Sequence, residues 1–409
     1  MLTNIVSFPI IKPNTLAVKL TTVGERIVRS GHPWIFTNSI EKINKEGVSG
    51  DIAIIFSHTK NKVIGVGLYD PDSPIRIKIL HSEGGAKLDA DFFSDKINKA
   101  YAIRIPLLET NTNSYRLLFG ENDGFPGFIA DVYNKVLVIK IYSAIWFPYL
   151  EIILKKLLEV SSCETAVFRL SRSLQNKEKT IGLTEGQILY GELKNEVIPF
   201  VEHGIHFSAN VIKGHKTGYF LDHRNNRKRV GELSNGKTVL DVFSYAGGFS
   251  VHALANGATE VTSVDISKQA LQLALENGKL NLFSGNHITV VGDAFEVLRK
   301  FISDKKTFDV VVIDPPSFAK SKKEIEKAKK KYKELAELGV QLTAKGGILV
   351  LASCSSRVSV DEFFQINKEI LNSQSRHFAL QSKTQHDIDH PIGFKEGAYL
   401  KTGYYREGN

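Results

Sequence analysis

The chain has 409 residues, 42% of them hydrophobic and 24% charged, so it is too long for one compact core and too apolar for wholesale disorder, and two or three domains are expected. Its net charge of +9 favours a polyanionic partner such as a nucleic acid. Two distant cysteines, Cys163 and Cys354, exclude a disulfide framework and a CxxC metal site, and no apolar run is long enough to span a bilayer.

The chain begins without the basic start, long apolar stretch and small-residue cleavage site of a secretory signal, so it is expected in the cytoplasm.

The N-terminal region is predicted to form a small β-barrel. Short apolar or alternating runs separated by Gly, Asn and Lys are typical of strands, and no amphipathic helix is needed between them. These runs cover residues 35–36, 52–56, 63–68 and 75–80. His32, Trp34 and Phe36 alternate along one strand, which favours a place for the aromatic rings in the barrel core.

The middle of the chain has a mixed pattern that predicts an α+β domain. Residues 91–103 and 149–160 have helical periodicity, and residues 128–142 are typical of a strand hairpin that turns at Asn134. Gly and Pro residues between positions 120 and 127 mark a turn-rich connection.

The second half of the chain alternates strands with helices and predicts an α/β fold. Runs typical of buried strands occur at residues 239–243, 260–265, 288–292, 309–314 and 348–353. Helical patterns lie between them, as at residues 267–281, where Leu271, Ala274 and Leu275 share one face. This alternation indicates a parallel sheet with helices on both sides.

Polar groups at the ends of the first three of these strands predict a nucleoside pocket, because ligands bind beyond the carboxyl ends of parallel strands. Asp241 is followed by a loop with two adjacent glycines, Gly247 and Gly248, which let a ligand approach the backbone at a helix N-terminus. Asp265 ends the second strand, where a carboxylate can accept both hydroxyls of a ribose, and Asp293 follows the third, suited to an adenine amino group. The loop lacks the GxGxxG spacing that cradles a pyrophosphate, so a ligand without pyrophosphate fits better than a dinucleotide.

The last two strands lead to candidates for a reactive centre. The fourth runs into D-P-P-S-F, in which the prolines stiffen the loop, Asp314 can accept from an amino group and Phe318 could stack on a base. The fifth leads to Cys354, flanked by serines at the ligand edge of the sheet, a setting that suits a reactive thiolate. A lone cysteine is more often a small buried hydrophobe, and Cys163 is assigned to that packing role.

These motifs together resemble those of the bacterial 23S ribosomal RNA large-subunit methyltransferases that form 5-methylcytosine. RSGHPWIF at residues 29–36 and SPIRIK at residues 73–78 are similar to the PUA segment of that family. YRLLFGENDGFPG at residues 115–127 is similar to its central turn, and GHKTGYFLDHR at residues 214–224 to the motif that precedes its Rossmann-like domain. The similarity extends over nearly the whole chain.

The resemblance implies an α/β enzyme that transfers a methyl group from S-adenosylmethionine (SAM) to a cytosine of 23S ribosomal RNA, free or in the assembling large subunit. It implies a PUA-like RNA-binding β-barrel at residues 1–88, a central α+β domain at 89–195 and a Rossmann-like SAM-dependent methyltransferase domain at 196–409. Cys354 would be the nucleophile, and Asp314, from the strand-end argument, is the second catalytic candidate. No metal is expected, and the oligomeric state is open, with a homodimer as one candidate.

The strand ends and the resemblance together assign two sets of binding residues. The SAM set is Phe220, Asp222, Arg224, Asp241, Phe243, Tyr245, Gly247, Gly248, Asp265, Ile266, Asp293 and Ala294. The basic residues assigned to RNA are Arg26, Arg29, Arg76, Lys78, Arg227, Lys228 and Arg229. The lysine-rich segment at 320–333 has helical character, and its lysines could either bind RNA or keep the helix soluble.

Two other functions stay open at this point. The D-P-P-S-F loop also resembles the loop of amino-methylating enzymes, so methylation of a ring nitrogen or an exocyclic amine, which needs no cysteine, is the second interpretation. A non-catalytic RNA-binding assembly factor is the third. The loop at Asp314 has proline where many RNA cytosine-5 methyltransferases have a second cysteine, so the sequence does not identify the group that finishes the reaction.

Overall fold

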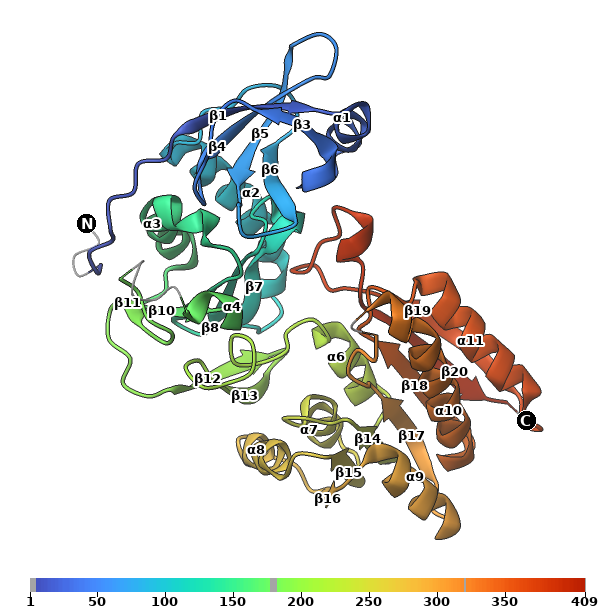
Figure 1. The fold of residues 1–409 in the computed structure, drawn as a ribbon. Helices are drawn as coiled ribbons and strands as arrows, with labels where there is room; N and C mark the ends of the chain where they lie inside the picture. Colours follow the sequence, from blue (N-terminus) through green and yellow to red (C-terminus); the bar gives the residue numbers. More distant parts are fainter. Residues whose placement is uncertain (1–4, 177–181, 320, 409) are drawn as a thin grey trace. The chain divides into compact units, whose positions relative to one another are not determined.

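The computed structural model describes residues 5–176, 182–319 and 321–408 (Figure 1). The chain divides into two compact units. Unit 1 comprises Met1–Val201, Ser208–Leu221 and Ile388–Gly397, and unit 2 comprises Glu202–Phe207, Asp222–Asp387 and Ala398–Asn409. The division into three domains stays a prediction. Among the described residues, no helix has the length and apolar character that a membrane crossing requires.

The first sheet of unit 1 has six strands in the order β2-β6-β5-β4-β1-β3. They are β1 Thr15–Leu20, β2 Trp34–Phe36, β3 Ile40–Ile43, β4 Ile52–Phe56, β5 Val63–Tyr69 and β6 Ile75–His81. β1 runs parallel to β4, and the other pairs are antiparallel. Leu16, Ile35 and Ile55 are fully buried in its core. The predicted β-rich N-terminal region is confirmed.

One helix of this region was not expected from the sequence pattern. Helix α1, Thr22–Arg29, begins after Thr21, whose hydroxyl accepts a hydrogen bond from the Gly24 amide (3.1 Å). Val28 is buried, whereas Arg26 and Arg29 are exposed. The helix spans only about two turns, too short a window for its apolar periodicity to stand out, so its N-cap threonine is the clearest local signal.

The expectation that the aromatic side chains of β2 fill the barrel core is wrong. Ile35 enters the core, and because side chains alternate along a strand, Trp34 and Phe36 lie on the opposite face. Trp34 is partly exposed, donates from Nε1 to Glu121 (3.0 Å) and meets the ring of Phe394 edge to face at 5.1 Å.

The second sheet of unit 1 has five strands in the order β11-β10-β9-β8-β7. Its strands are β7 Ser114–Phe119, β8 Phe128–Tyr133, β9 Val136–Ile141, β10 Thr165–Leu170 and β11 Ile188–Tyr190, and its helices are α2 Ala90–Leu108, α3 Leu150–Ser161 and α4 Arg172–Gln175. The predicted hairpin is confirmed, since β8 and β9 pair around Asn134, whose φ of 55° suits a tight turn. Cys163 is buried in this core, in agreement with its packing role.

Unit 2 contains a seven-stranded sheet in the order β16-β15-β14-β17-β18-β20-β19. Its strands are β14 Thr238–Val242, β15 Glu260–Asp265, β16 Asn286–Val291, β17 Phe308–Ile313, β18 Thr343–Ser353, β19 Phe378–Thr384 and β20 Lys401–Glu407. The five predicted strands are confirmed and pair in parallel. β19 and β20 were not predicted, and β20 pairs antiparallel with both β18 and β19. A separate two-stranded sheet consists of β12 Val197–Glu202 and β13 Ile205–Asn210.

Helices cover both faces of the seven-stranded sheet (Figure 1). The helices of unit 2 are α6 Arg224–Glu232, α7 Gly248–Ala255, α8 Lys268–Lys279, α9 Ala294–Ser303, α10 Ile325–Leu342 and α11 Val360–Ser373. Alternate residues of each central strand enter two separate cores, one with α6 and α7 and the other with α9, α10 and α11. Within the lysine-rich segment, Lys320 lies outside the described residues, and α10 buries Ala328 and Tyr332, which confirms its helical character.

A fully buried ion pair ties α2 to the central turn of unit 1. The Arg104 guanidinium binds both carboxylate oxygens of Asp123 (3.0 and 2.6 Å), and neither side chain is more than 3% exposed. Arg104 also donates to the carbonyls of Ala100, Arg116 and Asp389, so its guanidinium is hydrogen-bonded within unit 1. A buried charge deprived of its partner is costly.

Asp123→Ala should lower the free energy of unfolding of unit 1 by about 3–5 kcal/mol, because it leaves the Arg104 charge buried without a counterion. Both tryptophans of the chain, Trp34 and Trp146, lie in unit 1, so tryptophan fluorescence in a denaturant titration reports on this unit. Glu151→Ala, which breaks the exposed pair of Glu151 with Lys155, is the control and should change stability by at most about 1 kcal/mol. Equal unfolding midpoints for the two variants would contradict this account of the pair.

Candidate functional site

The parallel strands of unit 2 bring several polar loops to one edge of the sheet. Asp241 on β14 is in register with Val312 on β17. Ile313, the next residue of β17, is in register with Leu351 on β18. Because these strands run in the same direction at the same level, the segments that follow them leave the sheet at a common edge.

The loop after β14 is shaped by three left-handed backbone conformations. Phe243, Tyr245 and Gly247 have φ values of 64°, 47° and 74°. A Cβ added at Gly247 would lie 2.7 Å from the Cβ of Ala274 on α8, so this close approach requires glycine. Asn277 of the same helix donates to a loop carbonyl (3.0 Å). The loop is thereby held at the N-terminus of α7, where backbone amides favour an anionic group of a ligand.

Asp241 presents a buried carboxylate beneath this loop. One of its oxygens accepts hydrogen bonds from the amide (3.0 Å) and the hydroxyl (2.6 Å) of Ser250. Its other oxygen, Oδ1, has no hydrogen-bond partner among the described residues. Burial raises the pKa of Asp241 to about 7, although the Ser250 hydrogen bonds oppose the shift. An unsatisfied buried acceptor is costly, so this oxygen suits a donor group of a ligand such as an amine.

Two further carboxylates follow β15 and β16. Asp265 accepts from the Tyr245 amide (3.0 Å) and the Ser267 amide (2.8 Å), which ties the glycine-bearing loop to the end of β15. Asp293 caps α9 by accepting from two amides of its first turn. Each carboxylate has further lone pairs that can accept from ligand hydroxyl or amino groups. Ile266, beside Asp265, is 74% exposed and could cover an apolar ligand face, whereas Ala294 is buried at the start of α9.

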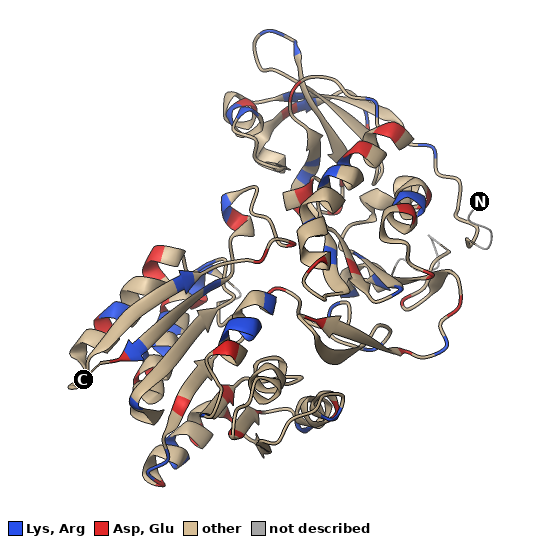
Figure 2. Ribbon diagram, turned by 180° about the vertical axis from the view of Figure 1, so that it is seen from behind, with Lys and Arg blue, Asp and Glu red and all other residues tan. Residues whose placement is uncertain are grey.

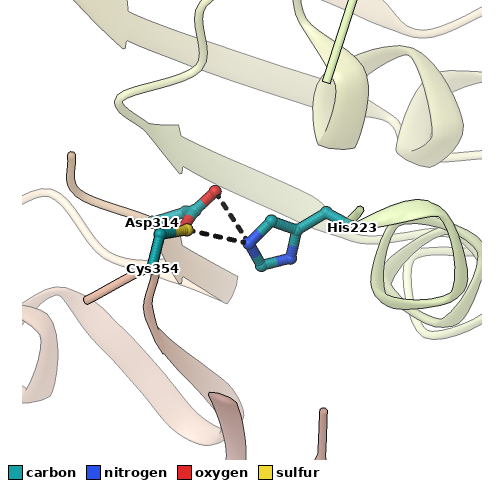
Figure 3. A group of neighbouring side chains, drawn as sticks. All are labelled: His223, Asp314 and Cys354. Atoms are coloured by element: carbon teal, nitrogen blue, oxygen red, sulfur yellow. Dashed lines mark hydrogen bonds and ion pairs between the residues drawn. The ribbon is translucent and has the colours of Figure 1, made fainter. Parts of the chain in front are cut away.

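A second cluster joins the ends of β17 and β18 to the residue before α6. Cys354 Sγ lies 3.7 Å from Asp314 Oδ1, and both side chains are partly buried. His223 is buried and points its Nε2 at both of them, 3.6 Å from Cys354 Sγ and 3.2 Å from Asp314 Oδ2 (Figure 3). Sequence reasoning paired Cys354 with Asp314 but assigned no role to His223, although His223 lies between two residues of the GHKTGYFLDHR motif that were assigned one.

The surroundings of Cys354 keep its thiol protonated. Burial and then the negative charges of Asp314 and Asp222 raise the pKa of Cys354 well above its ordinary value. The positive charge of Lys401 opposes this shift. Its ammonium lies in the turn after Cys354, where it donates to the carbonyls of Ser355 and Val358. Burial lowers the pKa of Lys401 itself to about 8. The thiolate expected from the sequence therefore needs a proton acceptor within the site.

The same three side chains form the group of potential metal ligands found among the described residues. Their donor atoms, from His223, Asp314 and Cys354, lie within 4.8 Å of one another. A closed structural zinc site takes four protein ligands, so this group lacks one. The expectation of a metal-free protein stays a prediction.

Several residues assigned to SAM have other contacts. Arg224 is fully buried and donates to Asp387 (2.8 Å), so its guanidinium serves the interior of unit 2 and is not available to line the pocket. Asp222 accepts from the Tyr399 hydroxyl (2.8 Å). Phe220 is 41% exposed and belongs to unit 1, so its place beside the cofactor stays a prediction.

Phe318, a candidate for base stacking, meets Tyr332 edge to face at 5.4 Å.

Two of the basic residues assigned to RNA are corrected by their burial. Lys78 is 6% exposed and pairs with the buried Asp70 (2.5 Å), and Arg227 is 3% exposed and pairs with the buried Glu202 (2.7 Å). Neither side chain can reach a phosphate without breaking a buried ion pair. The residues that stay candidates are Arg26, Arg29 and Lys228, which are exposed, and Arg76 and Arg229, which are partly exposed. Lys and Arg are otherwise spread over the elements of both units (Figure 2).

Gly247→Ala should weaken SAM binding at least tenfold, about 1.4 kcal/mol, because the new methyl group forces the loop after β14 away from Ala274. Gly346→Ala is the matched control: Gly346 has nearly the same φ, 72°, but nothing lies within 4 Å of its added Cβ. Both variants place alanine at nearly the same positive φ, so Gly346→Ala shows what such a substitution does away from the proposed pocket. Calorimetric titration with SAM is the measurement, and an unchanged affinity in Gly247→Ala would show that the loop does not form the pocket.

Comparisons with known proteins place the chain in a family. It matches the family model for S-adenosylmethionine-dependent methyltransferases over residues 116–399 and that for the PUA-like domain over residues 18–82. It is 40% identical over 392 residues to the ribosomal RNA large subunit methyltransferase of Deinococcus radiodurans, an alignment that covers 94% of this chain and 96% of that protein. It is 33% identical over 381 residues to ribosomal RNA large subunit methyltransferase I of Escherichia coli, covering 92% and 96% of the two chains.

Solved structures share the fold at lower identity. A SAM-dependent methyltransferase from Streptococcus mutans has a TM-score of 0.80 at 22% identity, over 95% of this chain and 99% of that one. A methyltransferase complexed with SAH, the demethylated product of SAM, also has a TM-score of 0.80 at 22% identity, over 96% and 100% of the two chains. The α/β methyltransferase fold with an N-terminal PUA-like domain and the dependence on SAM agree with the sequence predictions. The chain belongs to the S-adenosylmethionine-dependent methyltransferases, in the family of the ribosomal RNA large subunit methyltransferases.

Proposed function

We propose that this protein methylates carbon 5 of a cytosine in 23S ribosomal RNA through a covalent intermediate on Cys354. The observation that carries the proposed chemistry is the approach of Cys354 Sγ to Asp314 Oδ1 (3.7 Å) where two adjacent strands end. The curated relatives that align over nearly the whole chain are named ribosomal RNA large subunit methyltransferases, which supports this class of RNA as the substrate.

The chemistry of cytosine explains why a thiol and a carboxylate are needed together. Carbon 5 is a poor nucleophile, and addition of a thiolate to carbon 6 pushes electrons into the ring and makes carbon 5 enamine-like. In this proposal Cys354 adds to carbon 6, while Asp314 holds the amino edge of the base and eases charge build-up on the ring nitrogen. SAM, when bound, supplies the methyl group that carbon 5 takes up. Loss of the carbon 5 proton to a base then allows the sulfur to leave.

The cofactor would lie across the ends of β14, β15 and β16. The Oδ1 oxygen of Asp241, without a partner among the described residues, suits the cationic amino group of SAM, which would also favour the ionised form of a carboxyl whose pKa burial raises to about 7. Asp265 would accept from the ribose hydroxyls and Asp293 from the adenine amino group. Phe243, Tyr245, Gly247 and Gly248 would supply the backbone turn around the methionine part.

The RNA would reach this site as an unpaired or unstacked segment. A thiol cannot approach carbon 6 of a base inside a helix, so the target cytosine must leave its stack. The exposed arginines of α1, Arg26 and Arg29, and the exposed Lys228 of α6 are the candidates for phosphate contacts. Methylation of a nitrogen, which the D-P-P-S-F loop also suits, would not need Cys354.

The double variant Arg26→Ala, Arg29→Ala should bind an rRNA fragment more weakly and with a shallower dependence on salt. Each lost phosphate contact reduces the slope of log affinity against log salt by about 0.7–0.9, because fewer counterions are released. Lys155→Ala, which removes an equally exposed charge on α3, is the control and should leave the slope unchanged. Identical slopes for the double variant and the parent would show that α1 does not contact RNA.

Replacing the carbon 5 proton with fluorine should trap the protein on its RNA after methyl transfer, because fluorine cannot leave as a cation. Incubation with SAM and a 5-fluorocytidine-substituted rRNA fragment should therefore give an adduct that survives a denaturing gel. The adduct should require SAM, disappear in Cys354→Ala and persist in Cys163→Ala, since Cys163 is a buried core residue. Methylated product without any adduct, or full activity of Cys354→Ala, would end the cytosine-5 proposal and favour methylation of a nitrogen.

A further inference from the structure

The reaction proposed above leaves one proton without an assigned destination. Cys354 starts as a thiol, since burial and the negative charges of Asp314 and Asp222 raise its pKa. The S–H bond must break as the sulfur attacks carbon 6, and the acceptor must lie within contact of Sγ. Asp314 and His223 both lie within that distance of Sγ (Figure 3).

We propose that His223 is a catalytic residue that takes the proton of Cys354 and later returns it. The S–H bond breaks and an N–H bond forms at Nε2, while the electron pair of the sulfur forms the bond to carbon 6. When the sulfur leaves the methylated base, it regains its electron pair and takes the proton back from the imidazolium. This role rests on the proposed function, because it serves the attack of Cys354 on the base.

Basicity favours His223 over Asp314 as the acceptor. Nε2 lies 3.6 Å from Sγ and Asp314 Oδ1 lies 3.7 Å from it, so both are within reach. An imidazole has an ordinary pKa of about 6.5 and a carboxyl one of about 3.9, so the histidine is the stronger base by more than a hundredfold. Asp314 then serves as counterion, since its Oδ2 lies 3.2 Å from the same Nε2 and stabilises the imidazolium that forms.

The opposite side of the ring is held in a way that allows this role. The amide nitrogen of Asn226 faces Nδ1 of His223 (3.0 Å), and the ring of Phe249 packs against the imidazole at 5.5 Å. Hydroxyls of Thr384 (2.6 Å) and Tyr404 (2.9 Å) contact the other end of the same amide. The amide nitrogen also donates to the Thr402 hydroxyl (3.2 Å). All three hydroxyls can donate or accept, so an amide turned by 180° keeps these contacts and its oxygen accepts from Nδ1–H. With its proton on Nδ1 in that orientation, the neutral imidazole has its lone pair on Nε2 and can accept the thiol proton there.

Charged groups around the ring set the pH range in which His223 can act. Burial alone would lower the pKa of His223, but the charge and hydrogen bond of Asp314 and the charge of Asp222 outweigh it, and the pKa is raised. Arg227 opposes this shift, and the charge of Lys401 acts on Cys354. Only the neutral imidazole accepts a proton, so the methylation rate should rise with pH through the raised pKa. The acid limb of the rate profile should therefore lie above about pH 6.5.

The test separates the thiol chemistry from the reaction on RNA. In a Cys163→Ala background, iodoacetamide labels Cys354 alone, and the labelling rate is followed by mass spectrometry from about pH 5 to pH 9 without RNA. His223→Gln is compared with His206→Gln, which changes an exposed histidine of the same unit. We expect His223→Gln to label about tenfold more slowly near neutral pH and to methylate rRNA about a hundredfold more slowly in single turnover, with unchanged SAM affinity, while His206→Gln behaves as the parent.

The outcomes separate the role of His223 from the proposed cytosine-5 methylation. Parent-like labelling and methylation by His223→Gln would overturn the role of His223, while a Cys354-dependent fluorocytidine adduct in the same protein would leave the cytosine-5 reaction standing. Full methylation by Cys354→Ala would overturn both. One equivalent of zinc in the purified protein, lost in His223→Gln, would show a metal site in place of a proton acceptor. If His223→Gln fails to bind SAM, the parent protein decides, since a methylation rate that does not rise with pH across the range in which an imidazole loses its proton would contradict a neutral imidazole as the acceptor.

Discussion

The parallel register of β14, β17 and β18 is the constraint on which the chemistry of unit 2 depends. Adjacent strands lie about 4.8 Å apart, so residues that leave them at the same level come within reach of each other's side chains. Asp314 follows β17 directly and Cys354 follows β18 directly, and their polar atoms meet at 3.7 Å. A slip of one residue between these strands would turn each side chain to the other face of the sheet. The packed helices on both faces prevent such a slip, because both sets of alternate residues are buried.

Buried charges behind helix α6 hold His223 at this edge. His223 is the N-cap residue of α6, and the helix is anchored by Arg224 to Asp387 and by Arg227 to Glu202. Burial of Glu202 opposes its ionisation, but the charge of Arg227 and the hydrogen bond with His252 outweigh it and lower its pKa. Removing one partner of such a pair leaves an uncompensated charge, so the helix is tied firmly to the unit. Arg227, predicted from the sequence to contact RNA, thus helps instead to position His223.

The antiparallel strand β20 completes the setting of Cys354 from the other side. Its first residue, Lys401, is in register with Ser353 on β18, so its ammonium lies close to the turn that carries the cysteine. There it donates to the carbonyls of Ser355, Val358 (2.6 Å) and Tyr399 (3.2 Å). These hydrogen bonds hold the turn, and the positive charge also favours the thiolate. The pairing of β20 with β18 therefore also places the positive charge of Lys401 near Cys354.

Local pattern determined much of this protein from its sequence. Buried β-branched runs alternating with helical periodicity predicted the five parallel strands, and the order of Asp241, Asp265 and Asp293 after them predicted a nucleoside pocket. The reason is that a parallel strand buried on both faces carries its signal in its own residues. Cys354 and Asp314 were paired for the same reason, since the ends of adjacent parallel strands share an edge.

Only the tertiary structure decided the residues whose roles depend on partners far along the chain. His223 lies 131 positions from Cys354, and no local pattern distinguishes it from a histidine at any helix start. Lys78 and Arg227 have the sequence of exposed bases, but Asp70 and Glu202 bury them as ion pairs. Trp34 and Phe36 alternate as core residues would, and the burial of Ile35 assigns them to the other face. Charge and alternation state what a side chain can do, whereas burial and the partner opposite it decide which of those things it does.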